Sequence, residues 1–190
     1  MDNTNTRPIV ALFGSARPQP TDPIYQEVER QAALLTDAGW QIATGGGPGL
    51  MEAANKAAVQ HCTDGVCSLG YSIYLPFEAT TNDHVQQDTH HDTFFTRLDQ
   101  FCKCDAFIAN PGGIGTLLEI LMVAQLNQVD LMDKPLSLVG EAWKSIMDNA
   151  HDLLLRDGYI SPGDNTCWTY AQTPVNAALE LLSIQRSTER

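Results

Sequence analysis

The stretch ANPGGIGTLLEIL, residues 109–121, decides the fold of this chain. In it an apolar run breaks into three glycines and then resumes as a helix-forming segment that carries a single carboxylate, Glu119. Glycine lets the backbone approach a ligand closely, and the N-terminus of the following helix favours an anion. A carboxylate among apolar residues is costly to bury unless it has a partner or a use. The stretch therefore predicts a strand that ends in a phosphate-binding loop, followed by a helix whose Glu119 faces the sugar attached to that phosphate.

Strand-like and helix-like runs alternate on both sides of this stretch. We expect strands at residues 8–13, 40–44, 66–75, 105–110, 134–140 and 167–170, helices at 22–39, 50–61, 94–102, 116–128, 141–158 and 174–185, and a polar loop at 76–92. Strands without strict alternation, each followed by a helix, indicate a parallel sheet covered on both faces. The predicted fold class is α/β, a single Rossmann-like, doubly wound parallel sheet over residues 8–186. Residues 1–7 are expected to be a disordered or frayed N-terminus.

The composition excludes several classes of partner. The chain has 190 residues, 23 of them acidic and 11 basic, so its net charge is −12 at pH 7. It lacks the basic footprint of a nucleic-acid-binding protein, and an anionic membrane would repel it. Because no targeting segment or membrane-spanning run is evident, a cytoplasmic location is expected. The five cysteines are odd in number and irregularly spaced, which favours reduced thiols over a disulfide framework.

Three of the predicted strands end in glycine, and the carboxyl ends of parallel strands share one sheet edge. The candidate ligand-binding residues on these ends are Gly14, Ser15, Gly45, Gly46, Gly47, Gly49, Met51, Gly112, Gly113, Gly115 and Thr116. Their backbone N–H groups can converge on one anion, although each loop taken alone is equally well a tight turn. The dinucleotide fingerprint is not met, because Leu50 stands where its last glycine would fall, and there is no Walker A sequence. The pattern indicates a small phosphorylated ligand.

Two side chains are candidates for chemistry on that ligand. Glu119 lies about one turn inside a helix that is apolar almost all round, which predicts burial of this helix in the core or against a second subunit. The alternative is a structural carboxylate that caps the loop N–H groups. Arg97, just before the strand at 105–110, is the cation expected to reach the same sheet edge, with an ordinary surface arginine as the alternative.

A zinc site can be assembled from His84, His90, His91, Cys102 and Cys104, but their spacing matches no tight metal motif. We therefore expect no bound metal. The histidine-bearing loop is expected to cover a ligand or to pack at an interface.

The segments GGGPGLMEAANKAA (45–58) and PGGIGTLLE (111–119) resemble the LONELY GUY family of nucleoside 5′-monophosphate phosphoribohydrolases, once described as lysine decarboxylases. The second segment matches every fixed position of the family's P-G-G-x-G-T-x-x-E motif. The resemblance implies a Rossmann-like homodimer or higher homo-oligomer, with active sites near the subunit interface and no required cofactor. It implies hydrolysis of the N-glycosidic bond of AMP or a cytokinin ribotide to free base and ribose 5-phosphate. Glu119 and Arg97 match its catalytic residues, and the loop 112–116 its phosphate site.

A second reading remains open within the same superfamily, which also includes molybdenum cofactor carrier proteins. Leu98 stands where the family usually has lysine, and Leu118 where many members have an additional acid. The altered neighbourhood of Arg97 and the unusual segment rich in histidine and cysteine favour a protein that holds a phosphorylated ligand, such as the molybdenum cofactor, without cleaving it. The intact PGGIGTLLE segment favours the enzyme.

Overall fold

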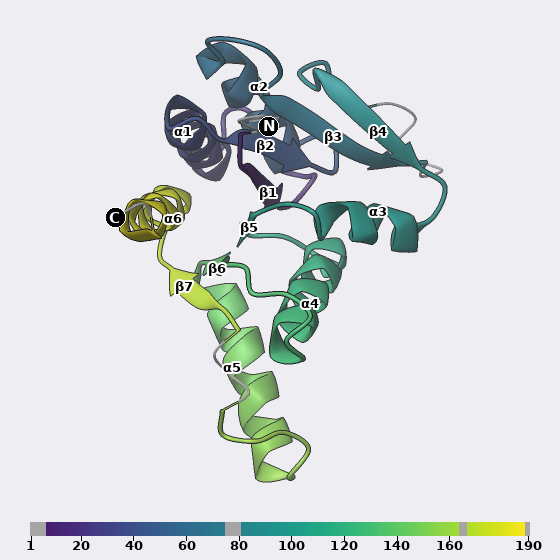
Figure 1. The fold of residues 1–190 in the computed structure, drawn as a ribbon, viewed down its shortest axis with the longest axis vertical. Helices are drawn as coiled ribbons and strands as arrows, with labels where there is room; N and C mark the ends of the chain where they lie inside the picture. Colours follow the sequence, from purple (N-terminus) through teal and green to yellow (C-terminus); the bar gives the residue numbers. More distant parts are fainter. Residues whose placement is uncertain (1–6, 75–80, 164–166, 189–190) are drawn as a thin grey trace, which may run out of the picture.

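Parallel strands form one sheet, and the chain winds outward from its middle in both directions (Figure 1). The computed structural model describes residues 7–74, 81–163 and 167–188. Of the predicted frayed segment 1–7, only residue 7 is among them. The strands are β1 (Ile9–Phe13), β2 (Gln41–Thr44), β3 (Ser68–Ile73), β4 (Gln87–His91), β5 (Ala106–Ala109), β6 (Leu136–Val139) and β7 (Thr169–Ala171), and the helices are α1 (Pro23–Asp37), α2 (Leu50–His61), α3 (Phe94–Phe101), α4 (Ile114–Gln128), α5 (Glu141–Arg156) and α6 (Pro174–Thr188). The strand order is β4-β3-β2-β1-β5-β6-β7. This single doubly wound α/β sheet confirms the predicted fold class.

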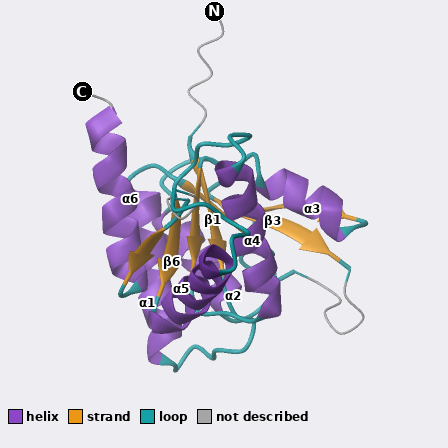
Figure 2. Ribbon diagram, turned by 90° about the horizontal axis from the view of Figure 1, so that it is seen from below, coloured by secondary structure: helices purple, strands orange, loops and turns teal. Residues whose placement is uncertain are grey.

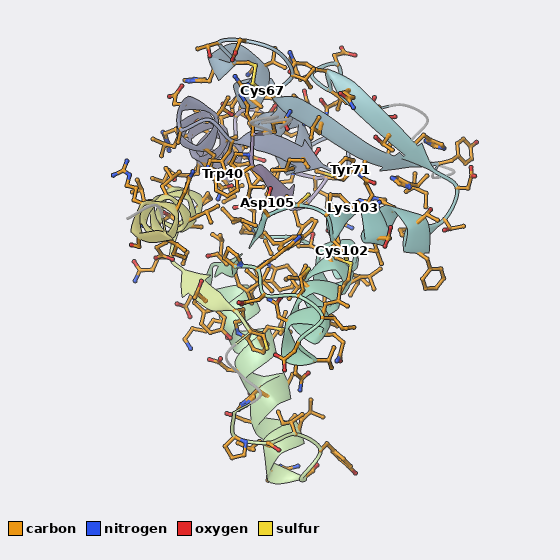
Figure 3. All side chains as sticks on the ribbon, in the orientation of Figure 1. Trp40, Cys67, Tyr71, Cys102, Lys103 and Asp105 are labelled. Carbon is orange, nitrogen blue, oxygen red and sulfur yellow. A yellow bond between two sulfur atoms is a disulfide. The ribbon has the colours of Figure 1, made fainter. Side chains whose placement is uncertain are left out.

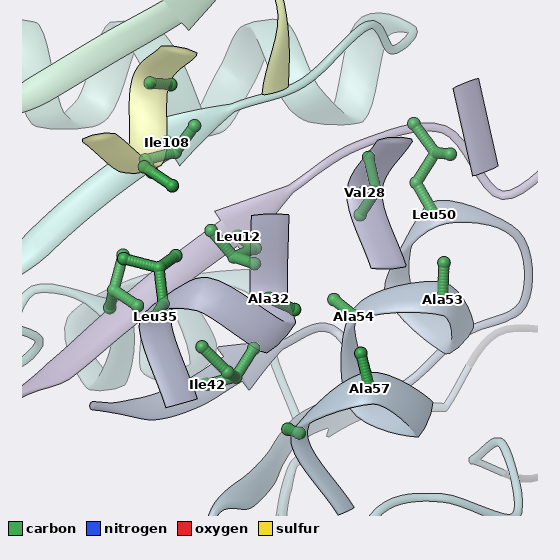
Figure 4. Packing of buried hydrophobic residues seen from close by; sticks show 14 of the residues in the cluster. Leu12, Val28, Ala32, Leu35, Ile42, Leu50, Ala53, Ala54, Ala57 and Ile108 are labelled. Carbon is green, nitrogen blue, oxygen red and sulfur yellow. The ribbon is translucent and has the colours of Figure 1, made fainter. Parts of the chain in front are cut away.

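Helices cover both faces of the sheet, as Figure 2 shows. On one face, buried residues of α1, α2 and α6 pack against β1, β2 and β5; Figure 4 shows Val28, Leu35 and Ala54 around Leu12 and Ile42. On the other face, buried residues of α3, α4 and α5 pack against the same central strands. Strands buried on both faces explain why the sequence shows apolar runs rather than alternation.

The predicted polar loop at 76–92 is wrong in its last part, because residues 87–91 form the edge strand β4. Among the described strands, it pairs in parallel with β3 alone, from Leu69 opposite Gln87 to Ile73 opposite His91. Three of its five residues are exposed, so the segment QDTHH has none of the apolar character by which a strand is predicted. Residues 76–80 of the predicted loop, and residue 75 of the predicted strand before it, lie outside the described part of the chain.

The expectation of reduced thiols is wrong for Cys62 and Cys67, which form a disulfide (Figure 3). The two residues flank the short turn between α2 and β3, which brings their Cα atoms to 5.8 Å, within the range that a disulfide spans. Cys102, Cys104 and Cys167 are thiols.

None of the helices in the described part of the chain combines the length and the apolar character that a membrane crossing needs.

Candidate functional site

The loops that follow β1, β2 and β5 meet at the carboxyl edge of the sheet. The backbone N–H of Ser15, after β1, donates to the carbonyl oxygen of Pro111, after β5, at 3.0 Å. The N–H of Leu50, at the start of α2, donates to the carbonyl oxygen of Ser15 at 2.9 Å. The strand order reverses between β1 and β5, and such a reversal is where open α/β sheets bind their ligands.

The PGGIGT loop presents unpaired donors at the start of α4. The first intrahelical bond runs from the N–H of Leu117 to the carbonyl oxygen of Gly113, at 3.0 Å. Within the described residues, the N–H groups of Ile114, Gly115 and Thr116 have no acceptor, and the Ile114 side chain is 83% exposed. The loop is therefore open, and N–H groups at a helix N-terminus are an anion-binding arrangement.

Gly112 is required by the shape of this loop. A Cβ atom at this position would lie 2.2 Å from the hydroxyl oxygen of Thr116. The Thr116 hydroxyl is thus held against the loop backbone, beside the unpaired N–H groups. By contrast, nothing lies within 4 Å of a Cβ placed on Gly113 or Gly115.

Some of the predicted ligand-binding glycines have a packing role. Gly49 has φ +70°, and a Cβ there would lie 2.6 Å from the carbonyl oxygen of Ser15. A Cβ on Gly14 would lie 3.0 Å from the Cβ of Leu50. At these two positions glycine permits the loops of β1 and β2 to touch each other, as the tight-turn alternative predicts.

Arg97 and Glu119 come together as a buried ion pair. The Nη2 of Arg97 donates to Oε1 of Glu119 at 3.1 Å, and its Nε donates to the carbonyl oxygen of Tyr71 at 2.9 Å. The two side chains are 12% and 10% exposed. The guanidinium also lies over the ring of Phe101, 5.4 Å from its centre. Arg97 is thus held in one orientation from two sides and is not an ordinary surface arginine.

The ion pair adjoins the first glycine loop. A Cβ on Gly45 would lie 2.5 Å from Nη2 of Arg97 and 3.0 Å from the sulfur of Met51. Gly45 and Met51 therefore line the pair from the β2 side, while Glu119 approaches from α4. The structure brings the two candidate catalytic residues together with the 45–51 segment.

Burial governs the protonation of this site. It raises the pKa of Glu119 to about 7, and the positive charge of Arg97 opposes this rise without cancelling it. At the end of β4, burial lowers the pKa of His91, and the charge of Arg97 contributes to the same direction. A carboxyl group that titrates near neutrality can both hold and release a proton at physiological pH.

We expect the raised pKa of Glu119 to make the protein lose stability as the pH rises from about 4.5 to 7. The ordinary pKa of about 4.5 applies to the unfolded chain, so between pH 4.5 and 7 the folded state binds more protons and stability falls as pH rises. The loss amounts to about 3 kcal/mol at pH 8 relative to pH 4.5. Urea unfolding across this range should show a slope that Glu119→Gln removes; an unchanged slope in that variant would contradict the assigned pKa.

The proposed zinc ligands do not gather into a metal centre. Among the described residues, no three His, Cys, Asp or Glu side chains are placed to hold a metal ion together. Burial raises the pKa of the Cys104 thiol to about 12 and also raises that of Cys102, so both favour the protonated form. His90 instead contacts the hydroxyl of Ser72 through Nδ1, at 3.1 Å.

Sequence reasoning missed two amides that support the first glycine loop, Asn55 and Asn82. Asn55 is fully buried on α2. Its polar side chain among the alanines of AANKAA could have indicated a buried hydrogen-bonding role. No comparable signal marks Asn82, whose side-chain Nδ2 bonds to residues 27 to 36 positions away in the chain.

A cavity of about 850 Å³ lies at the opposite edge of the sheet. It opens at the amino ends of β5, β6 and β7, where Phe107, Leu136 and Thr169 line it. Neither Arg97 nor Glu119 contributes to it, so this cavity is separate from the candidate site.

A Rossmann-like α/β sheet with an open glycine loop at its topological switch point is thus the class of structure that this chain adopts. The model of the family described as "Possible lysine decarboxylase" matches residues 51–181. The chain therefore belongs to this family, within the LOG or lysine-decarboxylase-like superfamily, as the sequence predicts.

Two curated relatives carry the same activity in their names. The chain is 30% identical over 143 residues to the cytokinin riboside 5′-monophosphate phosphoribohydrolase LOG7 of Arabidopsis thaliana, which covers 74% of this chain. It is 28% identical over 131 residues to a probable cytokinin riboside 5′-monophosphate phosphoribohydrolase of Oryza sativa subsp. japonica, which covers 68% of this chain. The alignments span 65% and 53% of the lengths of these two relatives.

Solved structures extend the likeness of the fold over nearly the whole chain. The molybdenum cofactor binding protein of Rippkaea orientalis superposes with a TM-score of 0.64 at 24% identity, covering 94% of this chain and 98% of that one. The molybdenum cofactor carrier protein of Chlamydomonas reinhardtii gives a TM-score of 0.66 at 16% identity, with 95% and 99% covered. At these identities the likeness is one of fold.

Proposed function

We propose that this protein hydrolyses the N-glycosidic bond of a nucleoside 5′-monophosphate of the AMP or cytokinin ribotide type, releasing free base and ribose 5-phosphate. The observation that carries the proposal is the buried Arg97–Glu119 pair, one helical turn from an open loop of unpaired N–H groups. The activities in the names of the curated relatives support the same reaction.

The chemistry requires both parts of the site. Breaking the bond between the ribose carbon and the base nitrogen builds positive charge on the sugar, and a nearby carboxylate stabilises that charge or takes a proton from the attacking water. Water supplies the oxygen that joins the sugar, and the leaving base takes up a proton. Glu119, with a pKa of about 7, suits the transfer of a proton from the attacking water. Arg97 orients the ligand or assists the departure of the base.

In this proposal the phosphate gives binding energy at a distance from the bond that breaks. The N–H groups of residues 114–116 and the hydroxyl of Thr116 hold it, which fixes the sugar in front of Glu119. The site needs no cofactor for this reaction.

The test is to incubate the purified protein with AMP, other nucleoside monophosphates and isopentenyladenine ribotide, and to measure released base by chromatography. We expect turnover with at least one of them. The absence of release from all of them would reject the enzyme.

The alternative is a carrier of a phosphorylated ligand such as the molybdenum cofactor. Leu98 and Leu118, which replace polar residues usual in the resembled family, favour it, as do the carrier proteins of the same fold. Tight retention of the cofactor through gel filtration, without turnover of any monophosphate, is the result that would establish the carrier.

We further propose that α4 forms part of a homodimer interface. The sequence left open whether this apolar helix is buried in the core or against a second subunit. Ile114, Leu118 and Leu121, spaced by four and three residues along one side of the helix, are exposed in the single chain. The protein's own core therefore does not cover this side, which is usual for a surface that a second copy covers.

Placing a charge on this side of α4 is expected to give a monomer. Leu121 is 49% exposed, so Leu121→Arg adds an unpaired charge to the proposed interface without disturbing the core. Light scattering after gel filtration should show a dimer for the parent protein and half that mass for the variant. Leu153→Arg, at a similarly exposed leucine on α5, is the matched control and should remain dimeric; a monomeric parent protein would contradict the proposal.

A further inference from the structure

The segment of residues 81–86 holds the carbonyl groups of the first glycine loop. The side-chain Nδ2 of Asn82 donates to the carbonyl oxygens of Gly46 and Gly47, at 3.1 and 2.9 Å. The backbone N–H of Asn82 donates to the same oxygen of Gly46, at 2.7 Å. A Cβ on Gly46 would lie 2.9 Å from the methyl carbon of Thr81. The segment therefore packs directly against the loop and fixes two successive carbonyls.

The Asn82 amide is itself fixed by a buried network. Its Nδ2 also donates to Oδ1 of Asn55, at 3.0 Å, so its two hydrogens are shared among three acceptors. The same oxygen of Asn55 accepts from the hydroxyl of Thr44 at 2.7 Å, and Nδ2 of Asn55 donates to the hydroxyl of Ser68 at 2.9 Å. Because Asn55 is fully buried, its amide cannot turn without losing bonds that water cannot replace, and its oxygen fixes the partly buried Asn82 amide in turn.

This arrangement decides where the N–H of Gly47 points. In a trans peptide the carbonyl of Gly46 and the N–H of Gly47 point in opposite directions, and the described chain has no cis peptide. Since the Gly46 carbonyl faces Asn82, the Gly47 N–H faces away from it. The N–H of Gly46 is already used by the hydroxyl of Thr44, at 3.0 Å, and Pro48 has none.

Gly47 is buried, yet within the described part of the chain its N–H has no acceptor. Buried backbone donors are nearly always paired, so an oriented and unpaired one indicates a ligand. The loop also contacts the ion pair, because Gly45 lies against Arg97.

We propose that Asn82 is a positioning residue that sets the Gly47 N–H as a hydrogen-bond donor to an oxygen of the bound phosphorylated ligand. The inference rests on the proposed function only in that the site holds such a ligand, and it applies to the enzyme and to the carrier alike. Asn82 itself does not touch the ligand; it acts through the peptide between Gly46 and Gly47.

The direct test observes the Gly47 amide by nuclear magnetic resonance in the ¹⁵N-labelled protein. Addition of AMP should move the Gly47 amide proton downfield. Inorganic phosphate and ribose 5-phosphate are the comparison ligands: a shift with phosphate alone assigns the accepting oxygen to the phosphate, and a shift only with the sugar present assigns it to the ribose. No movement of this resonance with any of the three ligands would overturn the proposal.

The variant Asn82→Ala should lose most of this shift and raise the dissociation constant for AMP about tenfold. If the enzyme proposal holds, KM rises similarly while kcat at saturation changes little, because a donor that binds ground state and transition state equally affects KM. An Asn82→Ala protein that binds AMP as the parent does, with the Gly47 shift intact, would also overturn the proposal.

Gln86→Ala is the matched control. The side-chain oxygen of Gln86 accepts from the N–H groups of Cys67 and Ser68, at 2.8 and 3.1 Å. The variant therefore loses the bonds that hold the C-terminal end of the segment 81–86 and keeps those of Asn82. It should lower stability while leaving the Gly47 shift and AMP affinity unchanged. A parent protein that shows the shift but releases no base would reject the enzyme and keep the positioning role, so the two proposals fail separately.

Discussion

Replacing Glu119 by glutamine should lower the rate of base release by about 10²- to 10⁴-fold, the usual contribution of a general acid–base group. Glutamine keeps the volume of the side chain but can neither carry the negative charge nor exchange a proton. The binding of ribose 5-phosphate should persist, because the phosphate donors belong to the backbone of residues 114–116. Chromatographic assay of released base, beside calorimetric titration with ribose 5-phosphate, measures the two effects separately.

Glu141→Gln provides the control for the same chemical change on the surface. Glu141 lies exposed at the start of α5 and should tolerate the substitution with full activity. A Glu119→Gln protein that turns over at the parent rate would show that another group performs the chemistry.

Replacing Arg97 by methionine should lower the rate of base release by about 10²- to 10³-fold, the cost typical of removing one oriented donor from an active site. It should also move the pH dependence of the reaction. The charge of Arg97 lowers the pKa of Glu119, so its removal raises that pKa, and a higher pH is then needed to ionise the carboxyl group. The acidic limb of the pH–rate profile is therefore expected to move to higher pH.

Arg97→Lys separates charge from geometry. The guanidinium reaches the Tyr71 carbonyl and Glu119 through different nitrogens, whereas an ammonium group cannot reproduce this planar fork. Lysine should restore the acidic limb toward lower pH but recover only part of the rate. Arg30→Met, at an exposed arginine that pairs with Glu27, is the control. An acidic limb that stays in place in Arg97→Met would contradict the assignment of Glu119 as the titrating group.

The central part of the fold could be predicted because its signals are local. Apolar runs that end in glycine mark β1, β2 and β5, and α2 has the predicted bounds of residues 50 and 61. The edge strand β4 could not be predicted in this way, since its polar residues pair with one neighbour and cover no core. The start of α4 at Ile114, two residues before the predicted one, reflects a helix that includes part of its own glycine loop.

The sequence could indicate that Arg97 and Glu119 lie near one edge of the sheet, but not which contacts they make there. The carboxylate in an apolar helix identified Glu119, and the expectation that Arg97 reaches the same edge agrees with the ion pair. That pair depends on how α3 and α4 are placed relative to each other on the sheet, which no spacing in the sequence determines. The same holds for Asn82, whose partners are fixed only when the chain returns from β3 to the first glycine loop.

The phosphate donors proposed for the PGGIGT loop are chiefly main-chain amides of residues 114–116, which substitutions at Arg97 and Glu119 leave in place. Loss of Arg97 or Glu119 is therefore expected to remove turnover of the proposed substrate while its phosphate still binds. Under the proposed function, a hydrolase and a carrier on this scaffold would differ by one or two side chains and would share the loop that binds the phosphate.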